Sequence, residues 1–180
     1  PKFGNTIEEI KKDGIKNIQL VPISTETHKK EDMNFQTAEL IKSLSIALRK
    51  INPRYLLILG DRFETLGAAF TGHILGLKNV HLHGGETSLG ALDNKLRNAI
   101  SQLSSYHFTS SEVHKNKVIK IVGSDQDVYN VGPLVIDGLL QLKPISKKEF
   151  ENKTGFSFSI NNFLITFHSE TLSKDFGIKG

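Results

Sequence analysis

Residues able to move protons or hold an anion lie close together in two stretches of this chain. Carboxyl groups gathered in one cavity raise one another's pKa, which is the condition for general acid and base catalysis at neutral pH. Glycines between them let the backbone approach a ligand closely, although a double glycine is more often an ordinary turn. The residues that could carry this chemistry are Asp61, Arg62, His83, Gly84, Gly85, Glu86, Thr87, Asp93 and Arg97.

Each of these residues also has a purely structural interpretation. Asp61 precedes a predicted helix and Asp93 opens another, and aspartate is a common helix N-cap, so capping and catalysis are equally compatible with Asp61. Arg62 is equally suited to binding an anion and to holding a nearby carboxylate. Glu86 fits a solvated loop acid as well as a catalytic one. The residue types alone leave these alternatives open.

Two histidines alternate in the second stretch. His81 and His83 are two positions apart on a predicted strand and therefore point to opposite faces of it. We expect one to be a core histidine and only His83, beside the glycines, to meet a ligand. A metal site needs more converging ligands than this, and none is predicted.

Apolar runs and helical periodicities alternate along the chain and would position these residues. Alternating strands and helices indicate parallel β-α-β units with right-handed crossovers, so we predict an α/β fold with a Rossmann-like parallel sheet. Ligands bind at the carboxyl ends of such strands, where both stretches lie. The predicted strands are 18–23, 55–59, 79–82, 106–109 and 128–131, and the predicted helices 6–12, 32–50, 64–75, 93–103 and 111–121.

The residue composition of the chain changes after Pro144. Residues 147–154 are polar and charged and are predicted to form a linker helix, and the apolar residues 163–167 are predicted to form a further strand. We therefore predict a first domain over 1–143, a linker over 144–162, and the start of a truncated second domain over 163–180. His168 follows the last apolar run, before Ser169 and Glu170; a surface role and a functional role are equally supported there.

Composition restricts the class of protein. The 180 residues are 38% hydrophobic and 23% charged, with a formal charge of +4 and no cysteine, which excludes disulfides and thiolate chemistry and favours the cytoplasm. The lysines are scattered, so we do not expect nucleic-acid binding, but a mild positive field suits a small anion such as a nucleotide sugar. No apolar run reaches the length of about 18 residues that a membrane helix needs.

A combination of motifs makes the sequence resemble a known family. It is similar to the hydrolysing UDP-N-acetylglucosamine 2-epimerases, in particular the branch that serves sialic and legionaminic acid synthesis. The residues that carry the resemblance are Gly60-Asp61-Arg62-Phe63-Glu64, His81-Leu82-His83-Gly84-Gly85-Glu86-Thr87, Gly90-Ala91-Leu92-Asp93 with Arg97, Tyr106-His107-Phe108, and Gly132-Pro133 with Ile136-Asp137.

The resemblance implies a two-domain, glycosyltransferase-B-type fold with a UDP-sugar bound between the domains. By that comparison the chain lacks the first β-α unit and most of the second domain. The implied reaction removes the proton at sugar C2 with loss of UDP, then adds water to the resulting glycal with inversion at C2, and needs no cofactor. It also implies a homodimer, as relatives commonly form.

The resemblance assigns roles to single residues. Asp61, Glu86 and Asp93 would share the proton transfers, and His168 would lie near the leaving UDP. The substrate would be contacted by Arg62, His83, Gly84, Gly85, Thr87, Arg97, Ser169 and Glu170. Many relatives have Glu at the position of His83, so proton transfer falls to Glu86 or to His83 itself, and Asn98 stands where relatives often have His. The alternatives are a glycosyltransferase or a non-catalytic nucleotide-sugar binding module on the same scaffold.

Overall fold

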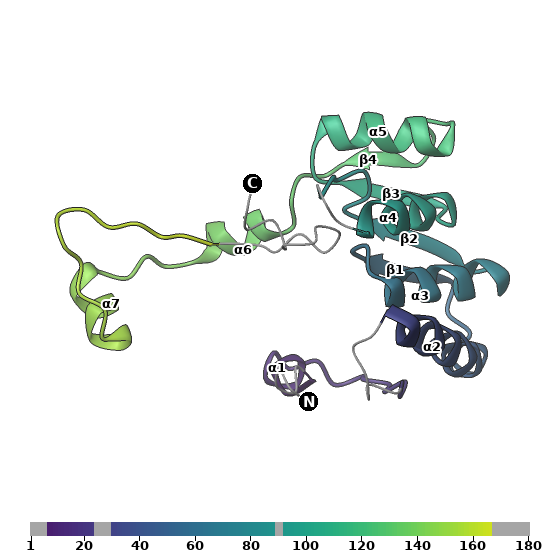
Figure 1. Ribbon diagram of the computed structural model, residues 1–180, viewed down its shortest axis with the longest axis horizontal. Coiled ribbons are helices and arrows are strands. Elements are labelled where there is room, and N and C mark those ends of the chain that lie inside the picture. The colour runs from purple at the N-terminus through teal and green to yellow at the C-terminus, as the bar shows by residue number, and fades with distance from the viewer. Residues whose placement is uncertain (1–6, 24–29, 89–91, 167–180) are drawn as a thin grey trace.

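The protein is built on a four-stranded parallel sheet (Figure 1). The computed structural model describes residues 7–23, 30–88 and 92–166. The strands lie side by side in the order β1-β2-β3-β4, and each neighbouring pair is parallel, which confirms the predicted α/β class. Their bounds are β1 Tyr55–Leu59, β2 Lys78–Leu82, β3 Tyr106–Thr109 and β4 Val128–Asn130.

One helix connects each strand to the next: α3 (Phe63–Ile74), α4 (Asp93–Gln102) and α5 (Glu112–Val122). Because each crossover leads to the adjacent strand in the same direction, right-handed connections place all three helices on one face of the sheet (Figure 1). A further long helix, α2 (Lys30–Ile51), packs along α3.

The core lies between the sheet and these helices. Ile58, Ala69 and Ile100 form its centre and are 3%, 0% and 0% exposed. Asn79 of β2 is fully buried beside them and donates through Nδ2 to the main-chain oxygens of Ala69, at 2.7 Å, and of Leu103, at 2.9 Å. A polar side chain on the strand therefore ties α3 and the end of α4 to the sheet.

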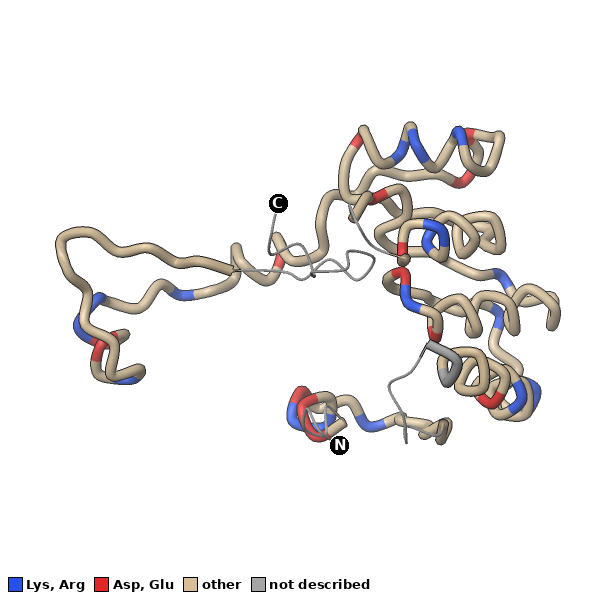
Figure 2. Tube along the Cα trace, viewed as in Figure 1, with Lys and Arg blue, Asp and Glu red and all other residues tan. Residues whose placement is uncertain are grey.

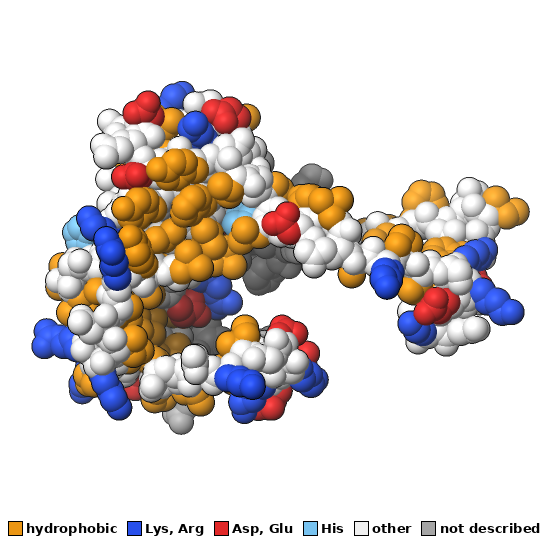
Figure 3. Space-filling view, turned by 180° about the vertical axis from the view of Figure 1, so that it is seen from behind, with side chains coloured by type: hydrophobic (Ala, Val, Ile, Leu, Met, Phe, Trp, Pro, Cys, Tyr) orange, Lys and Arg blue, Asp and Glu red, His pale blue; other side chains and the backbone are white. Residues whose placement is uncertain are grey.

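The opposite face of the sheet is apolar and exposed. Tyr55, Leu57 and Leu59 of β1 and Tyr129 of β4 are between 46% and 65% exposed. The rear view shows hydrophobic side chains gathered into one broad area on this part of the molecule (Figure 3). Strands in doubly wound folds are covered on both faces, so this exposure marks a surface with no cover among the residues that the structure describes.

Three short helices lie outside this body: α1 (Ile7–Lys12), α6 (Val135–Gln141) and α7 (Lys147–Thr154). None of them has a buried residue. The sequence predicts α1 and the charged helix α7, which begins at an N-cap serine, Ser146, whose hydroxyl accepts from the main-chain N–H of Glu149. The helix α6 was not predicted. Figure 2 shows Lys and Arg interspersed with Asp and Glu along the described residues.

Two predicted strands are wrong as far as the structure describes them. Residues 18–23 and 163–166 are irregular, and Leu20 and Leu164 are 66% and 98% exposed. A strand needs a neighbouring strand to satisfy its backbone N–H and C=O groups, and no described strand lies beside either segment. The proposed domain boundaries at 143 and 162 stay predictions. Within the described ranges, no helix is both long and apolar enough to cross a membrane.

Candidate active site

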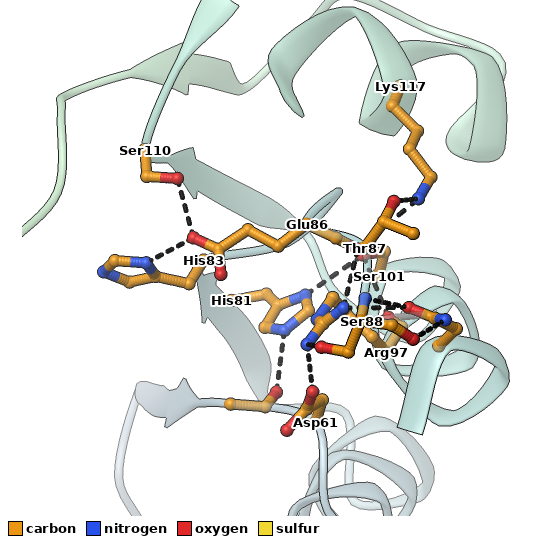
Figure 4. A network of polar contacts seen from close by, with 12 residues as sticks. Asp61, His81, His83, Glu86, Thr87, Ser88, Arg97, Ser101, Ser110 and Lys117 are labelled. Carbon is orange, nitrogen blue, oxygen red and sulfur yellow. Dashed lines mark hydrogen bonds and ion pairs between the residues drawn. The ribbon is translucent and has the colours of Figure 1, made fainter. Parts of the chain in front are cut away.

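Several of the predicted site residues come together at the carboxyl edge of the sheet, among them Asp61, His83, Glu86 and Arg97 (Figure 4). Asp61 follows β1, the His83–Glu86 segment follows β2, and Ser110 follows β3. The strands are parallel and adjacent, so their carboxyl ends meet at one edge, as expected for a ligand site in an open α/β sheet. Helix α4 adds Asp93 and Arg97 to the same edge.

Asp61 forms an ion pair with Arg97. The structure contradicts the capping interpretation of Asp61, because α3 has Arg62 as its N-cap residue and no side chain caps it. The carboxylate instead accepts from the Nη2 group of Arg97, and the two side chains are 20% and 7% exposed. A buried guanidinium that lost this partner would be strongly destabilising.

Arg97 holds three parts of the site together. Its Nη1 donates to the main-chain oxygen of Glu86 at 2.6 Å and to Asn94 Oδ1 at 3.2 Å, and its Nη2 reaches Ser88 Oγ at 3.4 Å besides Asp61. All these contacts are within the protein. In the structure Arg97 fixes the loop after β2 against the end of β1, and its predicted contact with substrate stays a prediction.

Asp93 is the first residue of α4, and it is not the N-cap, which is Leu92. Burial and the nearby charge of Asp61 raise the pKa of Asp93, against the opposing charges of Arg97 and Arg62. A carboxyl group with a raised pKa keeps its proton to higher pH. Asp93 is therefore suited to act as a general acid near the paired Asp61.

His83 has an unusual backbone conformation, with φ of 62°. Left-handed conformations in residues other than glycine are strained and concentrate at functional sites. The conformation is held by a hydrogen bond from the main-chain N–H of His83 to the oxygen of Phe108, 2.9 Å away. Its Nδ1 lies 2.7 Å from Glu86 Oε1. Because a carboxylate can only accept, Nδ1–H donates, and whenever the ring is neutral its Nε2 carries a free lone pair.

Glu86 is held as a carboxylate. Burial raises its pKa, but hydrogen bonds from Ser110 and His83 and the charges of His83 and His114 outweigh this, so the pKa of Glu86 lies below its usual value. A carboxylate that stays ionised at neutral pH is a poor proton donor. This arrangement suits Glu86 to orienting the His83 ring and suits His83 to exchanging a proton.

His81 is the buried member of the histidine pair, as predicted. It is 0% exposed, and burial lowers its pKa to about 4, so the ring is neutral at neutral pH. Nε2–H donates to the main-chain oxygen of Gly60 at 3.2 Å, and Nδ1 lies 3.1 Å from Ser101 Oγ. His81 thus links the residue before Asp61 to helix α4.

Sequence reasoning did not identify three residues of the site. Ser110 donates to Glu86 Oε1 at 2.7 Å, and His114 Nδ1 lies 2.8 Å from Ser110 Oγ. Lys117 donates to Thr87 Oγ1 at 2.6 Å and to the main-chain oxygen of Glu86 at 3.4 Å. The sequence did contain a signal for Ser110, because Ser110 directly follows a predicted strand, as Asp61 lies just after another.

The remaining predicted residues have local partners. Arg62 is 70% exposed and forms an ion pair with Glu64 at 3.0 Å. Gly84 and Gly85 pack within the protein: a Cβ on Gly85, whose φ is 81°, would lie 2.3 Å from the main-chain oxygen of His114. Only glycine fits this close approach of the loop to α5.

The residues of the last predicted site, His168, Ser169 and Glu170, lie outside the described residues, and their roles stay predictions. Within the described part of the chain, no group of three or more His, Asp or Glu side chains is placed to hold a metal ion.

The family model described as UDP-N-acetylglucosamine 2-epimerase matches residues 1–176, nearly the whole chain. The chain belongs to this family. The match includes both strand-end stretches that build the candidate site.

Two curated relatives are similar to the chain along most of its length. The GDP/UDP-N,N'-diacetylbacillosamine 2-epimerase (hydrolyzing) of Campylobacter jejuni is 31% identical over 173 residues, which cover 96% of this chain and 45% of the relative. The UDP-N,N'-diacetylbacillosamine 2-epimerase (hydrolyzing) of Legionella pneumophila is 31% identical over 166 residues, with 92% and 44% covered. The chain thus spans less than half the length of the relatives it matches.

Solved structures confirm the fold. The UDP-GlcNAc 2-epimerase of Methanocaldococcus jannaschii superposes with a TM-score of 0.68 over 82% of this chain and 42% of that chain, at 21% sequence identity. At this identity the likeness concerns the fold alone. It agrees with the family assignment and with the Rossmann-like architecture predicted from the alternation of strands and helices.

Proposed function

We propose that the complete gene product containing this chain is a hydrolysing 2-epimerase of a UDP-2-acetamido sugar. The reaction converts the UDP-sugar and water into UDP and the free amino sugar with inverted configuration at C2. In the first stage the C2 proton is removed and the C1–O bond to UDP breaks, which gives a glycal. In the second stage water adds at C1 and a proton adds at C2 from the opposite face.

The observation that carries the proposal is the convergence of two proton-transfer pairs at one sheet edge. One pair is His83 with Glu86, 2.7 Å apart, and the other is Asp93 beside Asp61, with the pKa of Asp93 raised. Inversion at C2 needs one group that removes a proton from one face of the sugar and another that delivers a proton to the other face. Two pairs with different proton affinities suit these two tasks.

We assign His83 Nε2 to proton exchange on one face of C2 and the Asp93 carboxyl group to proton exchange on the other. Glu86 holds the His83 ring by accepting from Nδ1–H. Asp61 has a different role: paired with Arg97, it fixes the edge of the site and adds the negative charge that helps raise the pKa of Asp93. His168, Ser169 and Glu170 are proposed to contact the leaving UDP, as the family resemblance implies.

The names of the two curated relatives favour UDP-N,N'-diacetylbacillosamine as substrate over UDP-N-acetylglucosamine. We also assign the protein to the sialic and legionaminic acid branch that the motifs resemble, and the names of these relatives support that assignment. A cytoplasmic location, which the absence of cysteine favours, and a homodimer belong to the same proposal.

The test is release of UDP by the complete gene product from each of the two sugars, with and without added acceptor sugars. A hydrolysing epimerase releases UDP from one of them with water alone. Release that depends on an acceptor would instead indicate a glycosyltransferase, and binding of the sugar without any release would indicate a binding module. His83→Asn and Asp93→Asn should each abolish the release, whereas the exposed control His73→Asn should not.

A further inference from the structure

Four side chains form a continuous line of hydrogen bonds that runs from helix α5 to the loop after β2. His114 Nδ1 lies 2.8 Å from Ser110 Oγ, Ser110 Oγ lies 2.7 Å from Glu86 Oε1, and His83 Nδ1 lies 2.7 Å from the same oxygen. Figure 4 shows Ser110 and His83 approaching Glu86 from different sides. The line ends on the ring that the proposed reaction uses.

The direction of each hydrogen bond follows from the chemistry of the groups. A carboxylate only accepts, so the single proton of the Ser110 hydroxyl points at Glu86. The hydroxyl oxygen then has only lone pairs left for His114, and Nδ1 of His114 must carry the proton that it donates. His114 therefore fixes the rotation of the Ser110 hydroxyl, because its N–H occupies the accepting side of the oxygen.

The backbone around Glu86 is fixed as well. Arg97 from α4 and Lys117 from α5 both donate to its main-chain oxygen, at 2.6 and 3.4 Å. The main chain of His114 lies against Gly85, where even a Cβ would not fit. The charged or titratable groups that face Glu86 are thus His83 from its own loop, Arg97 from α4, and His114 and Lys117 from α5. With the backbone held, the rotamer of the Glu86 side chain depends on Ser110 and His83.

We propose that Ser110 and His114 are positioning residues for the reaction: they hold the Glu86 carboxylate in the rotamer that orients the His83 ring toward the sugar. This inference rests on the proposed function. It predicts that loss of either residue leaves substrate binding intact and impairs the proton-transfer step, because the ring of His83 then samples orientations in which Nε2 no longer faces C2.

The kinetic test compares disruptive and conservative variants of the complete gene product. Ser110→Ala and His114→Phe should lower kcat by about tenfold to a hundredfold, a part of the 10²–10⁴ that a positioned acid or base contributes, with KM changed less than about twofold. Ser110→Thr keeps the hydroxyl, and His114→Asn places an N–H donor near the position of Nδ1, so both should recover most of kcat. His73→Phe and Ser157→Ala, at exposed positions, should leave kcat unchanged.

A second measurement does not depend on turnover. Long-range ¹H–¹⁵N spectra of the histidine rings should show His83 as the Nδ1–H tautomer in the wild-type protein and as a mixture of tautomers in Ser110→Ala and His114→Phe. Equal kcat values for Ser110→Ala and Ser110→Thr, or a His83 ring signal that Ser110→Ala does not change, would overturn the inference. A wild-type protein that turns over neither sugar would contradict the proposed function, while the His83 ring signal would still decide whether the line positions that ring.

Discussion

The carboxylate of Asp61, at the end of the first strand of the sheet, is ion-paired with the guanidinium of Arg97, 36 residues further along the chain. Both side chains are largely buried. The pair joins the end of β1 to the loop after β2, because Arg97 also donates a hydrogen bond to the main-chain oxygen of Glu86. The arrangement of this edge of the sheet therefore depends on one cation, Arg97.

We predict that Arg97→Met lowers the free energy of unfolding by about 3–5 kcal/mol, the cost of leaving a buried charge without its partner. Asp61→Asn should cost less, because the amide oxygen can still accept from Arg97, and the double variant should recover part of the loss, because it removes both charges. Urea unfolding followed by circular dichroism measures all three values. If Arg97→Met lowered the free energy of unfolding by less than about 1 kcal/mol, the ion pair would contribute little to stability.

The buried His81 makes stability depend on pH. Its pKa is about 4 in the folded protein, against the ordinary histidine value of 6.5 in the unfolded chain. The unfolded state binds more protons between these values, so the contribution of His81 is complete above about pH 6.5 and is lost as the pH falls toward 4. Between pH 7 and pH 5 the wild type should lose about 2 kcal/mol more than His81→Asn.

Unfolding free energies of the two proteins at both pH values check this prediction. His73→Asn, which removes an exposed histidine, is the matched control and should follow the wild type. Parallel pH profiles for wild type and His81→Asn would contradict a buried neutral His81.

Asp93 should control the alkaline side of the kcat profile, because it must be protonated to act as an acid. Asp93→Asn should reduce kcat by about a hundredfold or more, within the range of general acid catalysis. The charge of Arg62 lowers the pKa of Asp93, so Arg62→Ala should move the alkaline limb to higher pH. A limb that stays in place in Arg62→Ala would mean that another group is the acid.

The exposed apolar face of the sheet, opposite α3, α4 and α5, should make the 180-residue chain self-associate when it is produced alone. Leu57 and Leu59 are 65% and 60% exposed on this face, and contiguous apolar patches on soluble proteins mark interaction surfaces or aggregation sites. The isolated chain should bind the dye ANS and self-associate, and Leu57→Lys with Leu59→Lys should reduce both effects. A monomeric chain without dye binding would show that the face is covered in solution.

The sequence predicted most of the fold because the strands that form are continuous apolar runs between amphipathic helices. Residues 55–59 form a strand with the predicted bounds, and α4 begins at the predicted residue, Asp93. Residues 18–23 and 163–166 have a similar local pattern but form no strand. A local apolar pattern is compatible with a strand, but strand formation also requires a neighbouring strand, which the local pattern does not specify.

The site was predictable in its location and less so in its internal roles. Strand ends in a parallel sheet meet at one edge, so Asp61, His83, Glu86 and Asp93 were expected together, and the structure places them so. Their partners depend on distances across elements far apart in sequence. Arg97 turned out to hold Asp61 and Glu86, and the hydrogen-bonded line through Ser110 and His114 involves residues whose types are common on any surface.

Proton NMR of the reaction in heavy water is the most direct test of the central claim, that the two pairs at this sheet edge invert C2 through a glycal. The complete gene product should release UDP from UDP-N,N'-diacetylbacillosamine or UDP-N-acetylglucosamine and give a manno-configured sugar with deuterium at C2. A product that retains the original proton at C2, or the absence of turnover with both sugars, would contradict the account.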